Sequence, residues 1–388
     1  MKPPLYFISY SRTDAHQVRV IGETLHAHGI EIWQDINNLG QGIAESLIRK
    51  AISRETDGLI LFVTAESVAS DFIRAVELHE ADARIRRDPS FCIIPIFCIP
   101  IKDATSALSG CLTVPLSNFN GVKVEPPGDA PNLIAAANRA AVLIMDSVSY
   151  DIAAPFHVGL SSKQKVVGQL HSNLNFLSHF ETMLPSPEVW SQRIVPAINA
   201  VKTNLVSKGV KALRVTGHCH LSLGCLVGYI FRRPTAFRIE TVQNSSGTPS
   251  MWSSHEELGT NPLKVVELPG DRGSKDLFVV LNLYSPDIDS VLKCASTYGL
   301  KRRATITLNP PRYPYLITSN EAVAIARELS ATIKELHARY STSNVHLFLA
   351  VPLGLSLLIG YDLNACGRVQ CYEFNNKNSE YSPSCVLE

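Results

Sequence analysis

The first 150 residues alternate short apolar runs with segments in which apolar residues recur every three or four positions. The apolar runs predict strands near Leu5–Ser9, Ile30–Trp33, Gly58–Val63, Cys92–Phe97 and Leu112–Val114. The periodic segments predict helices near Ala15–His28, Ala44–Ser53, Asp71–Arg86 and Leu133–Ser147. Strands that alternate with helices indicate a parallel sheet covered on both faces, so residues 1–150 are predicted to form one α/β domain with a five-stranded parallel sheet.

After Tyr150 the alternation begins again, and two stretches resemble each other. Leu213–Glu240 and Val345–Glu373 each contain an apolar run, a helix-like segment that ends in Gly-Tyr, and a strand that ends in glutamate. The glycines of the two Gly-Tyr pairs, at 228 and 360, are offset by 132 residues. Two fused Rossmann-like halves, at about 160–270 and 275–388, explain this pattern within a second domain of residues 151–388, although any two α/β segments of similar length can match this well.

The charge balance limits the kinds of partner. The 36 Lys and Arg nearly equal the 35 Asp and Glu, which argues against binding of a long nucleic acid. A small anionic ligand needs only a few local cations and helix N-termini. The composition is therefore compatible with a nucleotide-sized ligand.

The cysteines and the apolar stretches indicate where in the cell the protein is located. The nine cysteines contain no CxxC pair, and His218 and His220 lack a third ligand in the sequence, so neither a disulfide framework nor a metal site is expected. The N-terminus has no apolar signal segment, and the longest apolar stretch, 345–360, is too short to span a bilayer. We expect a cytoplasmic protein without membrane contact.

Three motifs in the first domain occur in an order that resembles the TIR family. They are FISYSRTD at 7–14, the stretch from Trp33 through Asp35 to Leu39, Gly40, Gln41 and Gly42, and the stretch from Ser70 through Phe72 to Glu77. The resemblance covers about residues 1–150 and implies a flavodoxin-like TIR domain. In hydrolytic members the third motif carries the catalytic glutamate, so the resemblance implies that Glu77 cleaves the bond between nicotinamide and ribose in NAD+.

A lone carboxylate suits this reaction. Nicotinamide leaves as a neutral molecule, and a nearby anion stabilises the oxocarbenium-like ribose that remains. The alternative is that Glu77 is an ordinary exposed helix carboxylate, and Glu80, on nearly the same helix face, is the reserve candidate.

The other candidate residues of this domain lie in the first two motifs and beside Glu77. Ser11 and Arg12 are expected to hold the diphosphate or ribose of NAD+, because a guanidinium suits phosphate oxygens. The position four residues before Glu77, often aromatic in the family, is Ile73, so Trp33 or Phe72 is expected to supply the aromatic wall. Asp35, at the start of the BB loop, is also expected to contact NAD+, and the resemblance places the BB-loop residues Leu39, Gly40 and Gly42 where neighbouring TIR domains assemble.

The second domain resembles the SAVED family, a fusion of two CARF-like halves that recognises cyclic oligonucleotides in bacterial antiphage systems. The likeness rests on the stretch from Val345 to Pro352 with Gly354 and Gly360, and on the internal repeat. It implies a sensor whose ligand lies where the two halves meet, at the carboxyl ends of their strands. The candidate ligand-binding residues are His218, His220, Ser222, Tyr284, Ser285, Arg302, Arg303, Pro352, Gly354 and Leu355.

Together the two resemblances imply a cyclic-oligonucleotide-activated NAD+ glycohydrolase of antiphage (CBASS) defence. NAD+ is the substrate, no resident cofactor is expected, and cyclic tri-adenylate is the expected activator, although the sequence leaves ring size and bases open. Ligand binding is expected to drive self-assembly into oligomers or filaments. Two alternatives stay open, a TIR domain that acts only as an assembly adaptor, and an enzyme that makes cyclic ADP-ribose.

Overall fold

The computed structural model describes all residues except 1, 34–40, 182–183, 246–247, 286–287 and 376–378. The described chain forms two compact units. The first contains residues 1–150 with the segments Val167–Phe176 and Gln192–Asn204, and the second contains the remainder. The two added segments differ from the predicted single boundary at residue 150. They join the first unit through polar contacts such as Arg193 Nη1 to Glu23 Oε2 (3.1 Å) and Asn204 Nδ2 to Asp146 Oδ1 (2.8 Å).

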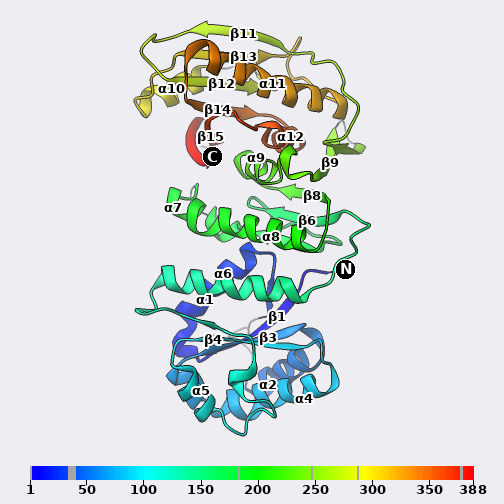
Figure 1. The fold of residues 1–388 in the computed structure, drawn as a ribbon, viewed down its shortest axis with the longest axis vertical. Coiled ribbons are helices and arrows are strands. Elements are labelled where there is room, and N and C mark those ends of the chain that lie inside the picture. Colours follow the sequence, from blue (N-terminus) through cyan, green and yellow to red (C-terminus); the bar gives the residue numbers. More distant parts are fainter. Residues whose placement is uncertain (1, 34–40, 182–183, 246–247, 286–287, 376–378) are drawn as a thin grey trace. The chain divides into compact units, whose positions relative to one another are not determined.

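The first unit is built on a five-stranded parallel sheet in the order β2-β1-β3-β4-β5 (Figure 1). Its strands are β1 (Leu5–Ser9), β2 (Glu31–Trp33), β3 (Gly58–Val63), β4 (Cys92–Phe97) and β5 (Val122–Lys123). Its helices are α1 (Ala15–Ala27), α2 (Gln41–Lys50), α3 (Ala65–Ala69), α4 (Leu78–Arg87), α5 (Ile101–Ala107) and α6 (Ala130–Ser147). Strand β7 (Ser172–Asn175) and most of α8 (Val195–Ser207) also belong to this unit. The strand order is that of flavodoxin-like folds, so the predicted fold class of this unit is confirmed.

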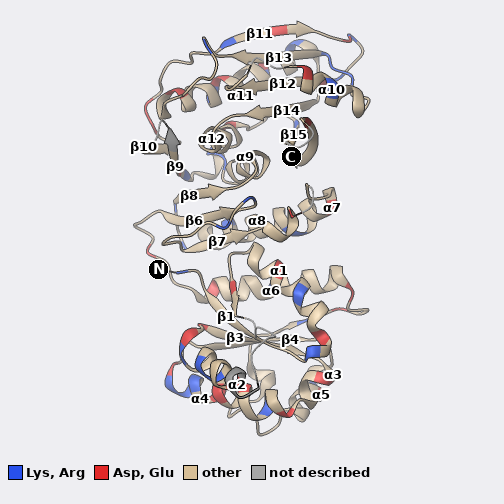
Figure 2. Cartoon of the chain, turned by 180° about the vertical axis from the view of Figure 1, so that it is seen from behind, with Lys and Arg blue, Asp and Glu red and all other residues tan. Residues whose placement is uncertain are grey.

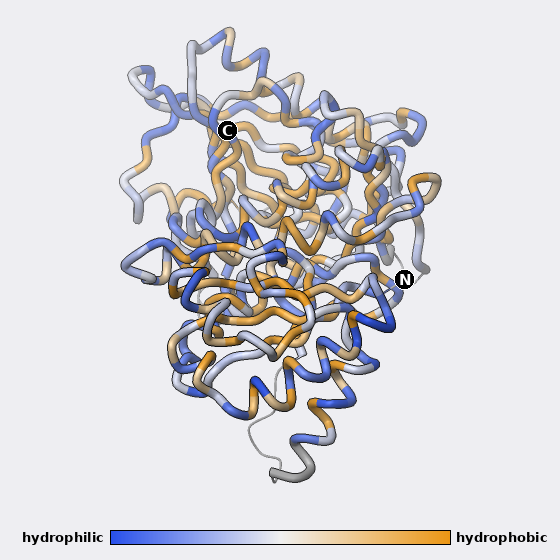
Figure 3. The backbone as a smooth tube through the Cα atoms, turned by 60° about the horizontal axis from the view of Figure 1, so that its bottom comes forward, coloured by the Kyte–Doolittle hydropathy of each residue, from blue (hydrophilic) through white to orange (hydrophobic). Residues whose placement is uncertain are grey.

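Two hydrophobic cores lie on the two faces of this sheet. Helices α1 and α6 cover one face, with residues such as Leu25 and Ile144 fully buried, and α2, α4 and α5 contribute to the core on the other face. All six residues of β3 are buried, as expected for a central parallel strand. Figure 3 shows the resulting contrast between apolar strands and more polar helices.

The fifth strand was predicted wrongly. Residues 112–114 form bends, and β5 is Val122–Lys123, which pairs with β4. The backbone N–H of Thr113 is bound by Asp82 Oδ1 at 2.7 Å, so it is not available to a strand ladder. Pro115 follows directly and ends any extended pairing.

The second unit contains two sheets. One includes β6 (Phe156–Ser161), β8 (Ala212–His218), β9 (Arg238–Ser245) and β10 (Thr248–Ser253). The other has the order β11-β13-β12-β14-β15-β16, from β11 (Lys264–Pro269), β12 (Asp276–Asn282), β13 (Ala304–Asn309), β14 (Asn344–Ala350), β15 (Arg368–Asn375) and β16 (Glu380–Leu387). Its helices are α7 (Pro187–Val189), α9 (Leu221–Ile230), α10 (Asp289–Thr297), α11 (Ser319–Tyr340) and α12 (Leu353–Asp362). Because β11 pairs with β13, the second half begins before residue 270.

Helices α9 and α12 pack against each other between the two sheets of this unit (Figure 1). A Cβ on Gly228 of α9 would lie 2.0 Å from Leu357 O and 2.9 Å from Tyr361 N. A Cβ on Gly360 of α12 would lie 1.9 Å from Cys225 O and 2.9 Å from Tyr229 N. Each pair of partners is related by the same 132-residue offset as the glycines, so the two similar stretches meet at a reciprocal crossing of their helices.

Candidate functional site

The predicted catalytic residue, Glu77, lies at the carboxyl end of the interior strand β1. Ser9 is the last residue of β1, and its hydroxyl donates to Glu77 Oε2 at 2.5 Å. Ser9 is fully buried and Glu77 is 6% exposed. This is the sheet edge at which open α/β sheets bind ligands. The hydroxyl of Ser9 is neutral, so this bond orients the carboxylate without cancelling its charge.

A wide helical turn brings Glu77 inward. Residues Ile73–Glu77 form a π-helical turn, which continues directly into α4. The consecutive residues Val76, Glu77 and Leu78 are all buried, a pattern that a regular surface helix does not produce. Extra residues in such turns often serve functional sites. The sequence predicted an ordinary helix here and missed both the π turn and the role of Ser9.

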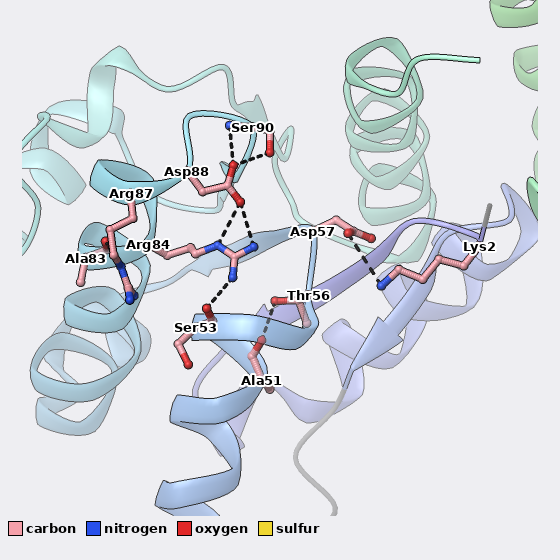
Figure 4. Close-up of polar contacts among 10 residues, drawn as sticks. All are labelled: Lys2, Ala51, Ser53, Thr56, Asp57, Ala83, Arg84, Arg87, Asp88 and Ser90. Atoms are coloured by element: carbon pink, nitrogen blue, oxygen red, sulfur yellow. Dashed lines mark hydrogen bonds and ion pairs between the residues drawn. The ribbon is translucent and has the colours of Figure 1, made fainter. Parts of the chain in front are cut away.

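Helix α4, which follows Glu77, is held by a network at its far end (Figure 4). Arg84 donates to the carbonyl of Ser53 and, through Nη2, to Asp88 Oδ2 at 2.9 Å. Asp88 also accepts hydrogen bonds from Ser90. Because Ser53 lies in the turn after α2, this network ties α4 to the end of α2.

The reserve candidate Glu80 has a different role. Its Oε1 pairs with Arg49 Nη1 of α2 at 2.6 Å. Figure 2 shows Lys or Arg and Asp or Glu interspersed on α2 and α4; other ion pairs there join neighbouring turns of one helix, whereas this pair joins the two helices. Glu80 therefore stabilises the packing of the two helices.

The other residues predicted to bind NAD+ or to assemble TIR domains fall into three groups. Arg12 is exposed at the start of a short 3-10 helix, and Ser11, which precedes it, contacts Thr13 at 2.9 Å. Trp33 stacks on Phe7 of β1 with ring centroids 5.1 Å apart, whereas Phe72 is 39% exposed directly before the π turn. Asp35, Leu39 and Gly40 lie outside the described residues, and Gly42 lies in α2.

Asp14 directly precedes α1, but its side chain accepts no hydrogen bond from the helix backbone. It is buried and accepts a hydrogen bond from Thr64 Oγ1 at 2.7 Å, so it connects the turn after β1 to the end of β3. Burial raises the pKa of Asp14, partly offset by the bond from Thr64. Asp14 therefore stabilises the sheet edge on which Ser9 lies.

In the second unit, the N-terminus of α9 is already bound by a carboxylate of the same chain. Glu373 of β15 accepts from the backbone N–H groups of Leu221 (3.2 Å, Oε1) and Ser222 (3.0 Å, Oε2). Lys163 Nζ lies 3.8 Å from Glu373 Oε1. Burial raises the pKa of Glu373. Ser222 is 2% exposed and receives a hydrogen bond from Ser384, so its assignment as a direct phosphate ligand is not supported by its position.

The two histidines of the first half differ in accessibility. His220 stacks on Phe180 at 4.4 Å between centroids, and its Nδ1 contacts Ser162 Oγ at 2.9 Å. Burial, with a smaller contribution from Lys163, lowers the pKa of His220 to about 4, so the ring is neutral near pH 7. The side chain of His218 is exposed at the end of β8, and its carbonyl accepts from the loop after β6. Of the two, His218 is the one open to a ligand.

Residues predicted in the second half lie partly at the expected edge. Tyr284 is 48% exposed after β12, and the N–H groups of Tyr284 and Ser285 bind Asn282 Oδ1. Pro352 begins α12 at the end of β14. These three positions lie at the carboxyl ends of parallel strands.

Gly354 and Leu355 are packing residues. Leu355 is fully buried, and a Cβ on Gly354 would lie 2.7 Å from the ring of Trp252. The N–H of Gly354 donates to Gln243 Oε1 at 3.0 Å. Both residues are buried, so neither is placed to contact a ligand.

Arg302 and Arg303, also predicted to bind the cyclic nucleotide, lie at a different strand edge from the other candidates of this half. Both precede β13, which runs parallel to β12, whereas Asn282 and Tyr284 lie at the opposite, carboxyl end. The length of a seven-residue strand, roughly 20 Å, separates the two edges. Arg303 instead lies over the ring of Tyr340 at 4.6 Å, and the backbone carbonyl of Arg302 would lie 2.3 Å from a Cβ on Gly270.

The described residues contain neither a candidate metal site nor a candidate membrane-spanning helix. No group of three or more His, Cys, Asp or Glu in them is placed to hold a metal ion. Within the same ranges no helix has the length and apolar character needed to cross a bilayer.

Comparison with known proteins assigns both regions. Residues 7–122 match the model of the TIR domain, and residues 196–387 match that of the SMODS-associated and fused to various effectors sensor domain, SAVED. The structure is similar to the Acinetobacter baumannii Cap4 SAVED/CARF-domain containing receptor in complex with the cyclic trinucleotide 2'3'3'-cAAA, with a TM-score of 0.50 and 15% identity over 99% of this chain and 80% of that chain. The same receptor with 3'3'3'-cAAA matches equally well.

Two sequence relatives match part of the chain. CD-NTase-associated protein 4 of Moraxella osloensis is 21% identical over 240 residues, which are 61% of this chain and 49% of the relative. The protein of the same name from an Acinetobacter species is 20% identical over 237 residues, 60% of this chain and 49% of its own. The chain thus spans about half the length of the curated relatives it matches. It belongs to the proteins that join an N-terminal TIR domain to a C-terminal SAVED domain.

Proposed function

We propose that this protein is a cyclic-oligonucleotide-activated NAD+ glycohydrolase of bacterial antiphage defence. The observation that carries the proposal is the Glu77 carboxylate, buried at the carboxyl end of β1 and oriented by Ser9. The π turn and the contacts of α4 explain how the chain holds an acidic residue there. The alternative of an ordinary exposed helix carboxylate does not fit a residue that is 6% exposed.

The chemistry follows from the charge of Glu77. As the bond between C1' of the ribose and the nicotinamide nitrogen breaks, the bonding pair goes to the nitrogen and nicotinamide leaves neutral. Positive charge develops on the ribose, and the nearby carboxylate stabilises it. Water then attacks C1' and loses a proton, which gives ADP-ribose. The proposed NAD+ contacts are Ser11, Arg12, Trp33, Asp35 and Phe72.

Activation is proposed to come from the SAVED domain. The solved relatives with cyclic trinucleotides support a cyclic oligonucleotide, and cyclic tri-adenylate is our first candidate. His218, Tyr284, Ser285 and Pro352, at strand carboxyl ends, are the proposed contacts. Binding would drive assembly of TIR domains through the segment that contains Asp35, Leu39, Gly40 and Gly42. The proposed location is the cytoplasm, where NAD+ is available.

The test is nicotinamide release from NAD+ with a panel of cyclic di-, tri- and tetranucleotides. We expect one ligand to activate the enzyme and Glu77→Gln to reduce the rate by about 100-fold or more, since a neutral amide cannot stabilise the cationic ribose. Glu80→Gln is the matched control on the same helix and should retain most activity. Retained turnover in Glu77→Gln would refute the assignment.

The same experiment distinguishes the proposed function from two others. An adaptor would show no NAD+ loss in any form and would keep its signalling in Glu77→Gln. An enzyme that makes cyclic ADP-ribose would release nicotinamide with the same dependence on Glu77, and mass spectrometry of the product would identify the ring.

A further inference from the structure

A basic pocket of about 290 Å³ lies in the second unit, away from the proposed cyclic-nucleotide contacts. It is lined by Arg233, Pro234, Arg327, Ser330, Ala331, Lys334, Asp362 and Asn364. Asp362 is the last residue of α12, and Arg233 lies just after α9. His220 and Pro352 begin these same helices, so the length of a ten-residue helix, about 15 Å, separates the pocket from the proposed contacts.

The charges in this pocket do not balance. Three cations face one carboxylate, because Asp362 is the only acidic residue among those that line it. Arg233 uses Nε (2.8 Å) and Nη2 (2.6 Å) on the same Oδ1 of Asp362. Arg327 and Lys334 lie close enough to favour ionised Asp362 electrostatically, although burial has the larger effect and raises its pKa. Two positive charges remain beyond the pair.

One of the remaining cations has a donor without an acceptor. Nε of Arg327 is buried and makes no hydrogen bond to any described residue. Buried donors are nearly always satisfied by protein, water or a ligand. Arg327, Ser330, Ala331 and Lys334 follow one another at helical spacing, so one stripe of α11 presents both cations to the pocket.

We propose that this pocket is a second ligand site, which binds a small phosphate-bearing molecule. Guanidinium groups donate paired hydrogen bonds to phosphate oxygens, and an ammonium adds charge. The volume is at the lower end for small-molecule sites and suits pyrophosphate or a nucleoside monophosphate. Because Arg233 follows α9 while the other polar residues come from α11 and the end of α12, the ligand would bridge both halves of the SAVED domain.

Binding can be measured on the full chain without NAD+ or a cyclic nucleotide, so the result does not depend on the proposed enzyme activity. Calorimetry and thermal unfolding would use pyrophosphate, adenosine monophosphate and adenosine, with sodium chloride to match ionic strength. We expect pyrophosphate or the monophosphate to bind and to raise the unfolding midpoint by several degrees, and adenosine to do neither. Binding of pyrophosphate alone would indicate an inorganic ligand, and stronger binding of the monophosphate would indicate a nucleotide.

Single substitutions locate the binding. Arg327→Gln and Lys334→Gln should each raise Kd about tenfold, because each removes a charge-assisted contact to phosphate. Lys334 is exposed, so its substitution keeps the fold even if that of Arg327 does not. Lys301→Gln removes an exposed lysine elsewhere in the same unit and should leave Kd unchanged. The proposal is overturned if the wild type binds no phosphate beyond the chloride control, or if all three variants bind equally well; the cations would then only balance Asp362 and the helix ends.

Discussion

The crossing of α9 and α12 makes a strong prediction about Gly228. A methyl group at this position would lie 2.0 Å from the carbonyl oxygen of Leu357. An ordinary van der Waals contact begins at 3.4 Å, and the obstacle is backbone rather than a flexible side chain. Gly228→Ala therefore requires the two helices to separate by about 1.4 Å, which opens gaps elsewhere along a close-packed interface.

Overpacking of this kind costs about 1–3 kcal/mol of the free energy of unfolding. For a unit of roughly 200 residues, each kcal/mol lowers the unfolding midpoint by about 2–4 °C, so Gly228→Ala should lower it by roughly 2–12 °C. Differential scanning calorimetry of the full chain measures this shift. Gly273→Ala is the matched control, because its nearest obstacle is a side-chain oxygen of Asp271 at 3.4 Å.

The reciprocal geometry allows a second test, with Gly360→Ala and the double variant. Gly360→Ala should cost about as much as Gly228→Ala, since its Cβ would lie 1.9 Å from Cys225 O. The double variant should cost less than the two single costs combined, because one separation of the helices accommodates both methyl groups. A shift in Gly228→Ala no larger than in Gly273→Ala, or strict additivity, would refute this description of the crossing.

Three further predictions concern polar groups. Ser9→Ala should lower the rate of nicotinamide release by about 10- to 100-fold, because Glu77 loses the bond that orients it; an unchanged rate would remove that role. Glu373→Gln should lower the free energy of unfolding by about 1–2 kcal/mol, since the N-terminus of α9 loses its anionic cap, and denaturant unfolding with the exposed Glu328→Gln as control measures it. Burial lowers the pKa of His28 to about 4, so between pH 6.5 and 4 the unfolded chain binds a proton that the folded chain does not. Stability should fall by about 3 kcal/mol more in wild type than in His28→Gln as the pH drops across this window, and equal pH profiles would contradict it.

Regular elements were the part of the fold that the sequence predicted best. Strands β3 and β4 have the predicted bounds, because a central parallel strand is a continuous apolar run with abrupt ends. The start of helix α11 is likewise explained by nearby residues, through a capping box between Thr318 and Glu321. In both cases the determining contacts are local in sequence.

Features that depend on distant residues were not predictable in this way. Glu373 was recognised as the end of a repeated strand, but its bond to the N–H of Ser222 joins residues 151 positions apart. The pairing of β5, and the position of Arg302 at the amino rather than the carboxyl edge, follow from the strand order. Nothing in the local pattern of 73–77 distinguishes a π turn from an α-helix. The position of Glu77 between the apolar residues Val76 and Leu78 is the one sign in the sequence that this carboxylate is buried.

The caps of α9 and α12 show what fusion of the two halves permits. Glu373 accepts from the N–H of Ser222, and Gln243 accepts from the N–H of Gly354, the residue 132 positions after Ser222. A homodimer would have to place the same residue at both helix starts. Within a single polypeptide one helix start carries a carboxylate and the other a neutral amide, so the starts of α9 and α12 differ in charge although the two stretches around them are similar.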